Sequence, residues 1–242
     1  MSETKARTLG FVGLGAMGSR VAGRLLATGH EVYGTNRTKS KAAQLVESGL
    51  VWRDTPREVA EAADVTFSMV TDDAALDSIS EGPDGLLAGL APGKVYVDMS
   101  TVSLQASRKL ADRVRSLGAN MLDAPVSGSV PAAEEGTLAI MVGGDGEIFH
   151  AVEPLLDELG STVTYVGANG QALLLKLAIN ISLGAQMLAF SEGLLLAARG
   201  GVDPKLAADV MTGSAIGSPM LKARVPLVLD LPEDAWFDVR ML

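Results

Sequence analysis

A glycine pattern near the N-terminus constrains the possible fold more strongly than any other stretch. The spacing GxGxxG occupies residues 13–18 and directly follows residues 8–12, a short apolar run that is typical of a buried strand. Residues 17–28 carry apolar side chains at helical spacing, and residues 31–36 have the pattern of a second strand. A lone GxGxxG is weak evidence, but this order of strand, glycine turn, helix and strand predicts a dinucleotide-binding domain.

The three glycines of this motif have separate physical roles. Gly13 permits the tight turn, Gly15 lets the backbone approach a pyrophosphate, and Gly18 lets the helix pack closely on the strand. The N-terminus of the helix then directs N–H groups and a partial positive charge toward the phosphates. The alternative is a glycine turn without a ligand. On the first interpretation the cofactor contacts are Gly13, Leu14, Gly15, Ala16, Met17 and Gly18.

The residues that end the second strand indicate which dinucleotide binds. An acidic residue there would accept a hydrogen bond from the free ribose 2′-OH of NAD. This chain has Asn36, Arg37 and Thr38 instead, so no carboxylate repels a 2′-phosphate, and the guanidinium can form charge-assisted bonds to it. We therefore expect NADP(H) rather than NAD(H). The alternative is that Arg37 and Lys39 are solvated residues at the start of a helix.

The alternation of strands and helices continues along the chain. Helical segments separate further strand-like runs at residues 50–52, 64–70, 94–98, 120–124, 138–142 and 162–166. This order predicts an α/β fold with a Rossmann-type, doubly wound, mostly parallel sheet, in which ligands sit at the carboxyl ends of the strands. Three of those ends carry residues 70–71, 100–101 and 127–129.

Composition excludes several other classes of protein. The 242 residues are 48% hydrophobic and carry a net charge of -9, which argues against a broad surface for nucleic acid or anionic membranes. The absence of cysteine excludes disulfides, thiolate catalysis and thiolate metal sites, and we expect no metal. The polar start of the chain has no apolar signal core, so a cytoplasmic protein is expected.

A long apolar segment follows the last strand. Residues 167–200 begin with glycines and continue as a single long helix, in which Lys176 and Asn180 lie four residues apart and so on one face. The polar residues Lys176, Asn180, Gln186 and Glu192 make a membrane span an unfavourable interpretation. We expect a nucleotide-binding domain at 1–166, followed at 167–242 by an interdomain helix and part of an all-α domain.

Several of these stretches together resemble one family. Residues 11–18, 98–101, 123–128, 141–144 and 167–180 are similar, in order, to motifs of the β-hydroxyacid dehydrogenase family, which includes 3-hydroxyisobutyrate dehydrogenases and tartronate semialdehyde and glyoxylate/succinic semialdehyde reductases. The sequence at 36–38 resembles the branch of NADPH-dependent semialdehyde reductases. The resemblance also implies that the family's helical domain continues beyond Leu242.

The resemblance implies roles for individual residues. Lys176 matches the catalytic lysine, and Asn180 matches its helical partner, which helps to hold the substrate. Ser129 stands where many relatives have a second glycine, so the alternatives are a less permissive loop or an added hydroxyl in the substrate pocket. The other implied contacts are Ser127 and Gly128 with the substrate carboxylate, Val70 and Thr71 with the cofactor through their backbone, and Thr101 near the nicotinamide.

The chemistry of the residues agrees with these roles. Reduction of an aldehyde needs a hydride donor, a proton donor for the developing alkoxide and an anchor for the acid group. Ser127 and neighbouring N–H groups can anchor a carboxylate, and Lys176 can stabilise the oxyanion and deliver the proton. Neither His30, in a turn, nor His150, on a surface-type helix, suits that task. The alternative is that Lys176 is an ordinary helix-surface lysine.

The sequence thus predicts an NADP(H)-dependent oxidoreductase that interconverts a small β-hydroxyacid and its semialdehyde or keto acid. Two alternatives remain, an imine reductase-like enzyme and a non-catalytic NADP-binding or scaffold protein. A missing helical layer would expose apolar surface of the long helix, so we expect a homo-oligomer, a dimer or a tetramer. Met187, Leu188, Leu194 and Leu195 are candidates for that contact or for the chain's own core.

Overall fold

The computed structural model describes residues 7–231 and residue 233. The chain divides into two compact units, residues 1–176 and 177–242. This division falls inside the long helix α9 (Gln171–Arg199). The domain boundary expected at 166/167 stays a prediction.

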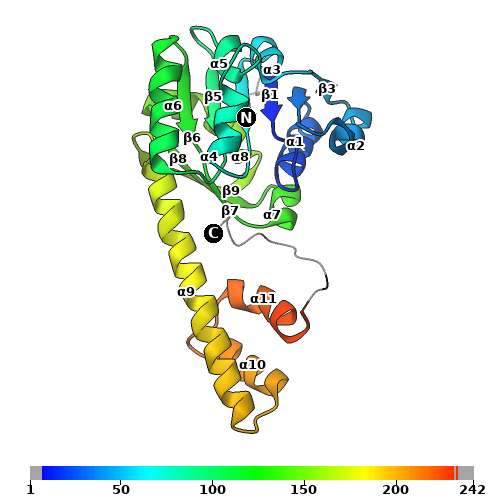
Figure 1. Ribbon diagram of the computed structural model, residues 1–242, viewed down its shortest axis with the longest axis vertical. Helices are drawn as coiled ribbons and strands as arrows, with labels where there is room; N and C mark the ends of the chain where they lie inside the picture. The colour runs from blue at the N-terminus through cyan, green and yellow to red at the C-terminus, as the bar shows by residue number, and fades with distance from the viewer. Residues whose placement is uncertain (1–6, 232, 234–242) are drawn as a thin grey trace. The chain divides into compact units, whose positions relative to one another are not determined.

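The first unit is built on one sheet (Figure 1). Its strands are β1 (Thr8–Val12), β2 (Glu31–Thr35), β3 (Val51–Trp52), β4 (Val65–Ser68), β5 (Val95–Asp98), β6 (Asn120–Asp123), β7 (Val126–Ser127), β8 (Leu138–Gly143) and β9 (Gly160–Gly167). The strand order is β3-β2-β1-β4-β5-β6-β8-β7, with β9 paired to β8. All pairings among β1 to β6 are parallel, which confirms the doubly wound, mostly parallel sheet.

The far edge of the sheet differs from the sequence prediction. Strand β8 runs antiparallel to β6 and to β7, and only its pairing with β9 is parallel. The two-residue strand β7 was not predicted, because a pair of residues directly after Pro125 carries no readable alternation.

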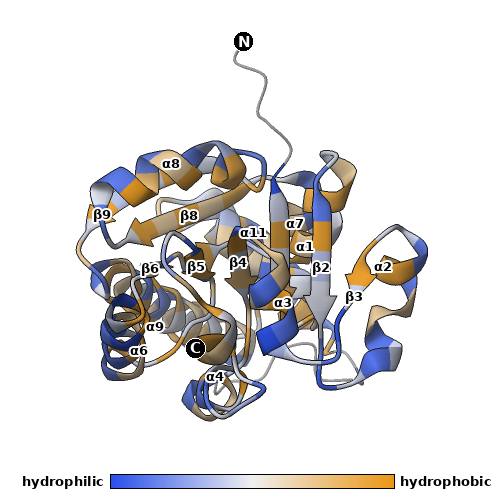
Figure 2. Cartoon of the chain, turned by 90° about the horizontal axis from the view of Figure 1, so that it is seen from above, coloured by the Kyte–Doolittle hydropathy of each residue, from blue (hydrophilic) through white to orange (hydrophobic). Residues whose placement is uncertain are grey.

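Helices cover both faces of this sheet. They are α1 (Gly18–Ala27), the short 3-10 helix η1 (Lys39–Ala42), α2 (Ala43–Glu47), α3 (Pro56–Ala62), α4 (Asp73–Ser80), α5 (Leu86–Gly89), α6 (Leu104–Ser116), α7 (Val130–Glu135) and α8 (Gly146–Asp157). Seen from above, α1, α7 and α8 lie on one side of the strands and α3, α4 and α6 on the other (Figure 2). Phe11 and Phe149 belong to one buried apolar cluster, and Leu76 and Val114 to another.

Side chains cap several helices of this unit. The side chain of Thr55 accepts the N–H of Glu58 at 3.1 Å, and the Glu58 carboxylate accepts the N–H of Asp54 at 2.9 Å, so side chains satisfy donors on both sides of the start of α3. The side chains of Asp72, Ser103 and Asp145 accept N–H groups at the starts of α4, α6 and α8.

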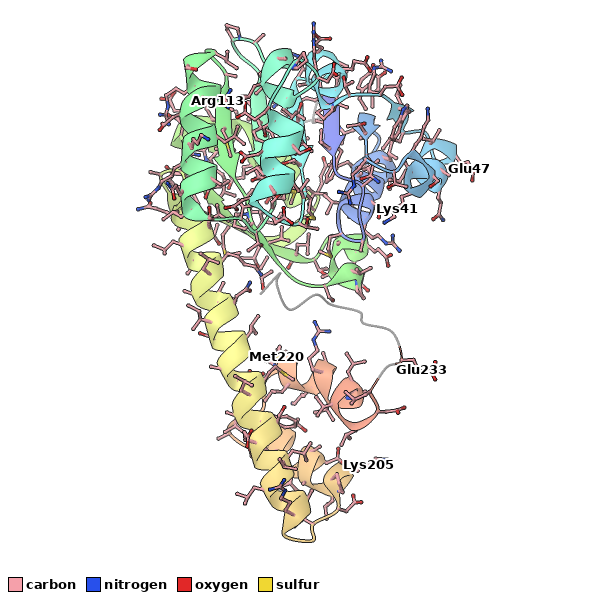
Figure 3. All side chains as sticks on the ribbon, viewed as in Figure 1. Lys41, Glu47, Arg113, Lys205, Met220 and Glu233 are labelled. Atoms are coloured by element: carbon pink, nitrogen blue, oxygen red, sulfur yellow. The ribbon has the colours of Figure 1, made fainter. Side chains whose placement is uncertain are left out.

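The second unit contains the greater part of α9 together with α10 (Pro204–Gly213) and α11 (Pro219–Leu229). Its buried apolar residues are Phe190, Leu194, Ala207, Ala208 and Leu221. Met187 and Met220, the latter labelled on α11 in Figure 3, pack against this cluster. Of the four residues proposed for an intersubunit contact, Met187 and Leu194 therefore belong to the chain's own core, whereas Leu188 and Leu195 are 70% and 46% exposed.

By length and composition alone, α9 could cross a membrane. A single helix of this kind is weak evidence, because a core helix of a soluble protein passes the same test.

Candidate cofactor and active site

The predicted cofactor residues lie at one edge of the sheet. Because β2, β1, β4 and β5 are neighbouring parallel strands, their carboxyl ends meet there. The loops that leave those ends contain the glycine motif, Asn36, Val70 and Thr101. The chain changes direction across the sheet between β1 and β4, which is where open α/β sheets bind ligands.

The glycine loop has the geometry that its spacing predicts. Gly13 has a φ of 96°, in the left-handed region, and a Cβ at this position would collide with the carbonyl oxygen of Met69. A Cβ on Gly18 would collide with the carbonyl of Gly13 and lie 3.0 Å from the Phe11 ring. Around Gly15 a Cβ would meet no atom within 4 Å. The first and third glycines are therefore required by the fold, whereas the second faces open space, as expected of a backbone that a pyrophosphate approaches.

The N-terminus of α1 has no side-chain cap, although the N–H groups of Ser19 and Arg20 already donate to the carbonyls of Gly15 and Met17. Its cap residue, Met17, makes no side-chain capping bond, and the first turn contains no acidic residue. In contrast, side chains cap α3, α4, α6 and α8. The first N–H groups of a helix have no partner within it, and together with the helix dipole they attract negative charge. These residues thus fit a dinucleotide phosphate.

Asn36 connects the glycine loop to the end of β2. Its Oδ1 accepts the N–H of Leu14 at 3.1 Å, and its Nδ2 donates to the carbonyl of Thr38 at 3.0 Å. The N–H of Gly13 donates to the carbonyl of Thr35 at 3.1 Å. Asn36 therefore fixes both the loop expected under the phosphates and the turn expected beside the adenosine ribose.

The basic residues beside this turn differ in their surroundings. Lys39 lies 5.0 Å from the centre of the Trp52 ring and 3.9 Å from Asp54. Arg37 is exposed and forms no ion pair within the part of the chain that the structure describes. Arg53, which the sequence analysis did not single out, stacks on Tyr33 just beyond β3. The contact between Arg53 and Tyr33 depends on the pairing of β3 with β2, which the sequence does not reveal.

A buried network supports the loop after β4. Asp98 is 1% exposed, and its Oδ1 accepts hydrogen bonds from Ser68 Oγ at 2.8 Å and Ser100 Oγ at 2.6 Å. Ser100 Oγ in turn accepts the N–H of Val70 at 2.9 Å. Burial raises the pKa of Asp98, and the bonds from the serines oppose that shift. Because Val70 has already donated its N–H, any backbone contact with a cofactor must use its carbonyl.

Thr71 and Thr101 lie beside this network. Thr71 is exposed and its hydroxyl donates to Asp72 at 3.2 Å, and Thr101 is half-buried directly after Ser100. Their contacts with a cofactor stay predictions.

The predicted substrate loop follows β6. Ser127 lies in β7, opposite Ala139 of β8, and is half-buried. Gly128 has a φ of 147°, and a Cβ there would lie 2.7 Å from Leu138, so the position requires glycine. Ser129 is the N-cap residue of α7 but makes no side-chain capping bond, and it is exposed. Its hydroxyl is therefore not used by the helix that it precedes.

Lys176 lies on the second turn of α9 and is half-buried. Burial lowers the pKa of its amine, because the charged form loses hydration. Asn180 lies one turn further along the helix, in the second unit, and is 6% exposed. The lysine therefore does not have the freely solvated surroundings of an ordinary surface lysine.

The two histidines are not alternatives to this lysine. His30 is 7% exposed and its Nε2 lies 2.9 Å from Glu158 Oε2, which joins the turn after α1 to the end of α8. His150 is exposed and pairs with Glu153. Among residues 7–231 and 233, no group of three or more His, Cys, Asp or Glu side chains is arranged to hold a metal ion.

Comparison with known proteins gives the family. Residues 8–167 match the NAD-binding domain of 6-phosphogluconate dehydrogenase, and residues 169–242 match the NAD-binding domain of NADP-dependent 3-hydroxyisobutyrate dehydrogenase. Glyoxylate/succinic semialdehyde reductase 2 of Arabidopsis thaliana, a chloroplastic protein, is 36% identical over 92% of this chain and 62% of its own length.

Two further relatives are similar to this chain over most of its length. The 2-hydroxy-3-oxopropionate reductase of Escherichia coli is 39% identical over 88% of this chain and 73% of its own length. A solved structure of Psf3 with NADP+ and 2-OPP is 32% identical, with a TM-score of 0.85 over 91% of this chain and 78% of that one. The chain thus spans between about three fifths and four fifths of these relatives. On its two family matches, its relatives and its fold, the chain belongs to the β-hydroxyacid dehydrogenase family of NAD(P)-dependent oxidoreductases.

Proposed function

We propose that this protein is an NADP(H)-dependent reductase of small carboxylate-bearing aldehydes or ketones and, in reverse, a β-hydroxyacid dehydrogenase. The observation that carries the proposal is the half-buried amine of Lys176, whose pKa is lowered by burial, on a helix that starts at the carboxyl edge of the sheet. An amine in such surroundings is a better proton donor and acceptor near neutral pH than a solvated lysine.

In the proposed reaction a bound nicotinamide would supply the hydride for the carbonyl carbon of the substrate. Lys176 hydrogen-bonds the carbonyl oxygen, stabilises the negative charge that develops there, and gives its proton to that oxygen. In the oxidation direction the neutral amine takes the hydroxyl proton. Ser127, Gly128 and Ser129 bind the substrate carboxylate, and Asn180 helps to hold the substrate on the same face of the helix as Lys176.

NADP(H) is proposed over NAD(H) because the turn after β2 has Arg37 and lacks a carboxylate at Asn36. The NADP+ in the related Psf3 structure supports this choice. The names of the relatives support substrates of the glyoxylate, succinic semialdehyde, tartronate semialdehyde or 3-hydroxyisobutyrate type.

Three further parts of the proposal concern the surroundings of the enzyme. We propose a cytoplasmic location without a nucleic-acid or membrane partner. We also propose a homo-oligomer, dimer or tetramer, because Leu188 and the neighbouring Ile181 and Leu196 on α9 are 70%, 73% and 75% exposed. Light scattering of the purified chain measures that state directly, and a monomer at all concentrations would contradict it.

A steady-state panel tests the reaction. NADPH oxidation is followed with glyoxylate, succinic semialdehyde, tartronate semialdehyde and a cyclic imine, and the first three are repeated with NADH. Turnover of at least one acid with NADPH, and lower kcat/KM with NADH, is the expected result. Turnover of the imine alone would favour an imine reductase. Tight NADPH binding without turnover of any compound would favour a scaffold protein.

A further inference from the structure

The carboxylate of Asp123 is bound to the beginning of α9. Asp123 is the last residue of β6 and is fully buried. Its Oδ1 accepts the N–H of Gly170 at 2.8 Å and the amide of Asn169 at 3.3 Å, and its Oδ2 lies 3.4 Å from the N–H of Leu173. A carboxylate at this end of a helix satisfies donors that have no partner within the helix and also interacts favourably with the helix dipole.

The sheet has made room for this carboxylate. Gly143 of β8 lies opposite Asp123, and a Cβ on Gly143 would lie 2.8 Å from Oδ1 and 2.9 Å from Oδ2. The space that a side chain would occupy on β8 is thus occupied by the aspartate. Strand β8 and helix α9 confine the carboxylate from two sides, so its position is determined by the fold.

Asp123 also stands between the two parts of the proposed reaction. Lys176 follows Leu173 by three residues, about 4.5 Å along the helix axis. Ser127 of the proposed substrate loop follows Asp123 itself by four residues. The same residue therefore ends the strand that leads to the substrate loop and holds the helix that carries the amine.

We propose that Asp123 is a positioning residue for Lys176. Its carboxylate fixes the first turn of α9 and so the place at which the amine meets the substrate carbonyl. The proposal rests on the proposed function of Lys176. Asp123 itself does not exchange a proton with the substrate, because the hydrogen bonds that its carboxylate accepts within the described residues all come from backbone and amide groups at the start of α9.

An amide cannot replace this carboxylate fully. Both oxygens of Asp123 face N–H donors, so the NH2 group of an asparagine would point at one of them in either orientation. The substitution also removes the charge that interacts with the helix dipole. Asp123→Asn is therefore nearly equal in shape to the native residue and still expected to loosen the first turn of α9.

The test is a double-mutant cycle of Asp123→Asn and Lys176→Ala, with kcat, substrate KM, the Kd of NADPH and the Tm measured for each protein. Asp123→Asn should lower kcat on the order of 10- to 100-fold, because a small displacement of a reacting group has effects of that size, and leave the Kd of NADPH within about twofold. In the Lys176→Ala background the same substitution should change kcat less than about twofold, since the group that it positions is gone.

Lys94→Met serves as the control for stability alone. Lys94 directly precedes β5, and Asp98 is the last residue of that strand. At the usual rise of a strand the two residues are about 13 Å apart, at opposite edges of the sheet. Its amine donates to three backbone carbonyls, so its removal should lower the Tm without reaching the site. Lys94→Met should keep kcat within about twofold even where its Tm falls as far as that of Asp123→Asn.

If Asp123→Asn does not fold, Asn169→Ala takes its place, because it removes one of the donors to the same oxygen from a half-buried position, together with the bond of the same amide to the Met121 carbonyl at 2.9 Å. Its expected loss of kcat through Asp123 is about 3- to 10-fold, the value of one hydrogen bond. Equal losses from the Asp123 or Asn169 substitution in both backgrounds, or no loss in either, would overturn the positioning role. Wild-type turnover in Lys176→Ala alone would instead overturn the proposed function on which the positioning role rests.

Discussion

The Oδ1 atom of Asn36 accepts the backbone N–H of Leu14 at 3.1 Å, which joins the end of β2 to the glycine loop after β1. One side chain thus positions the loop expected to hold the pyrophosphate while occupying the place where an NAD-dependent domain has an acidic residue. An asparagine can accept the N–H of Leu14 and so position the loop without repelling a 2′-phosphate.

Asn36→Asp should reverse the preference for the cofactor. The carboxylate can still accept the N–H of Leu14, but it places a negative charge beside the 2′-phosphate and no longer donates to Thr38. We expect the KM of NADPH to rise about 10-fold or more and that of NADH to change much less. Arg37→Gln is the matched variant, because it removes a positive charge without adding a negative one, and it should weaken NADPH alone by about 10- to 150-fold. Unchanged ratios of kcat/KM for the two cofactors in both variants would contradict the NADP(H) assignment.

Gly15→Ala should affect the binding of NADPH, whereas Gly18→Ala should affect the stability of the fold, although the two positions are only three residues apart. The new methyl at Gly15 meets nothing within 4 Å, so we expect an unchanged Tm and a loss of NADPH affinity. The methyl at Gly18 collides with the carbonyl of Gly13, and overpacking of this kind destabilises by about 1–3 kcal/mol. Thermal unfolding and fluorescence titration with NADPH separate the two. A Gly15→Ala protein that binds NADPH normally would show that no phosphate lies against this glycine.

Lys94→Met should destabilise the first unit without affecting its site. The Lys94 amine donates to the carbonyls of Ala60, Glu61 and Ala63 at 2.8, 3.0 and 2.7 Å, and these carbonyls end α3, where they lack partners within the helix. Hydrogen bonds that involve a charged group contribute about 1.5–3 kcal/mol, so the Tm should fall by about 3–12 °C. Lys109→Met, at an exposed position of α6, is the control and should change the Tm by less than about 2 °C. Equal Tm values for the two variants would exclude the capping role.

Much of the fold was readable from the sequence because its units are local. The strand, glycine turn and helix at residues 8–27 follow from apolar periodicity and from the spacing of glycines at positions where the fold leaves no room for a Cβ. The antiparallel direction of β8 was not readable, since an apolar run has the same pattern in either direction. His30 looked like a turn residue after Gly29, and its partner Glu158 lies 128 residues away in the chain.

The site was predictable only in part, for the same reason. The glycine loop and the turn at Asn36 are local motifs, so their geometry followed from spacing. Asp123 appeared in the sequence only as part of a family motif, and its partner Gly170 is 47 residues distant. One signal did exist, because an acidic residue that ends a buried parallel strand needs a specific partner, but the sequence does not reveal which.

The rate of reduction should fall as the pH rises through the lowered pKa of Lys176. Reduction needs the protonated amine and oxidation the neutral amine, so the two directions should have opposite pH profiles that turn at the same pKa. Since burial lowers that pKa, the turning point should lie below the ordinary value of 10.5. Initial rates with NADPH and with NADP+ measure the two profiles. In Lys176→Arg, whose guanidinium stays charged, the dependence on this pKa should disappear in both directions. Profiles that keep the same turning point in this variant would assign it to another group.

Lys176→Met should make the protein more stable while it removes most of the activity. The folded state binds the proton of Lys176 less tightly than the unfolded chain, because burial lowers the pKa of the amine. At every pH below its ordinary value of 10.5 the unfolded chain is therefore favoured by this group, and the penalty disappears only above that value. Methionine keeps much of the apolar stem and removes the charge, so the Tm at pH 7 should rise, and the gain over the native protein should shrink as the pH approaches the ordinary pKa.

The kcat of Lys176→Met should fall about 10²- to 10⁴-fold, as for loss of a general acid. A higher Tm with normal turnover would identify a buried lysine without a role in the reaction, and a lower Tm with lost turnover would indicate that the amine makes a stabilising contact in the folded state.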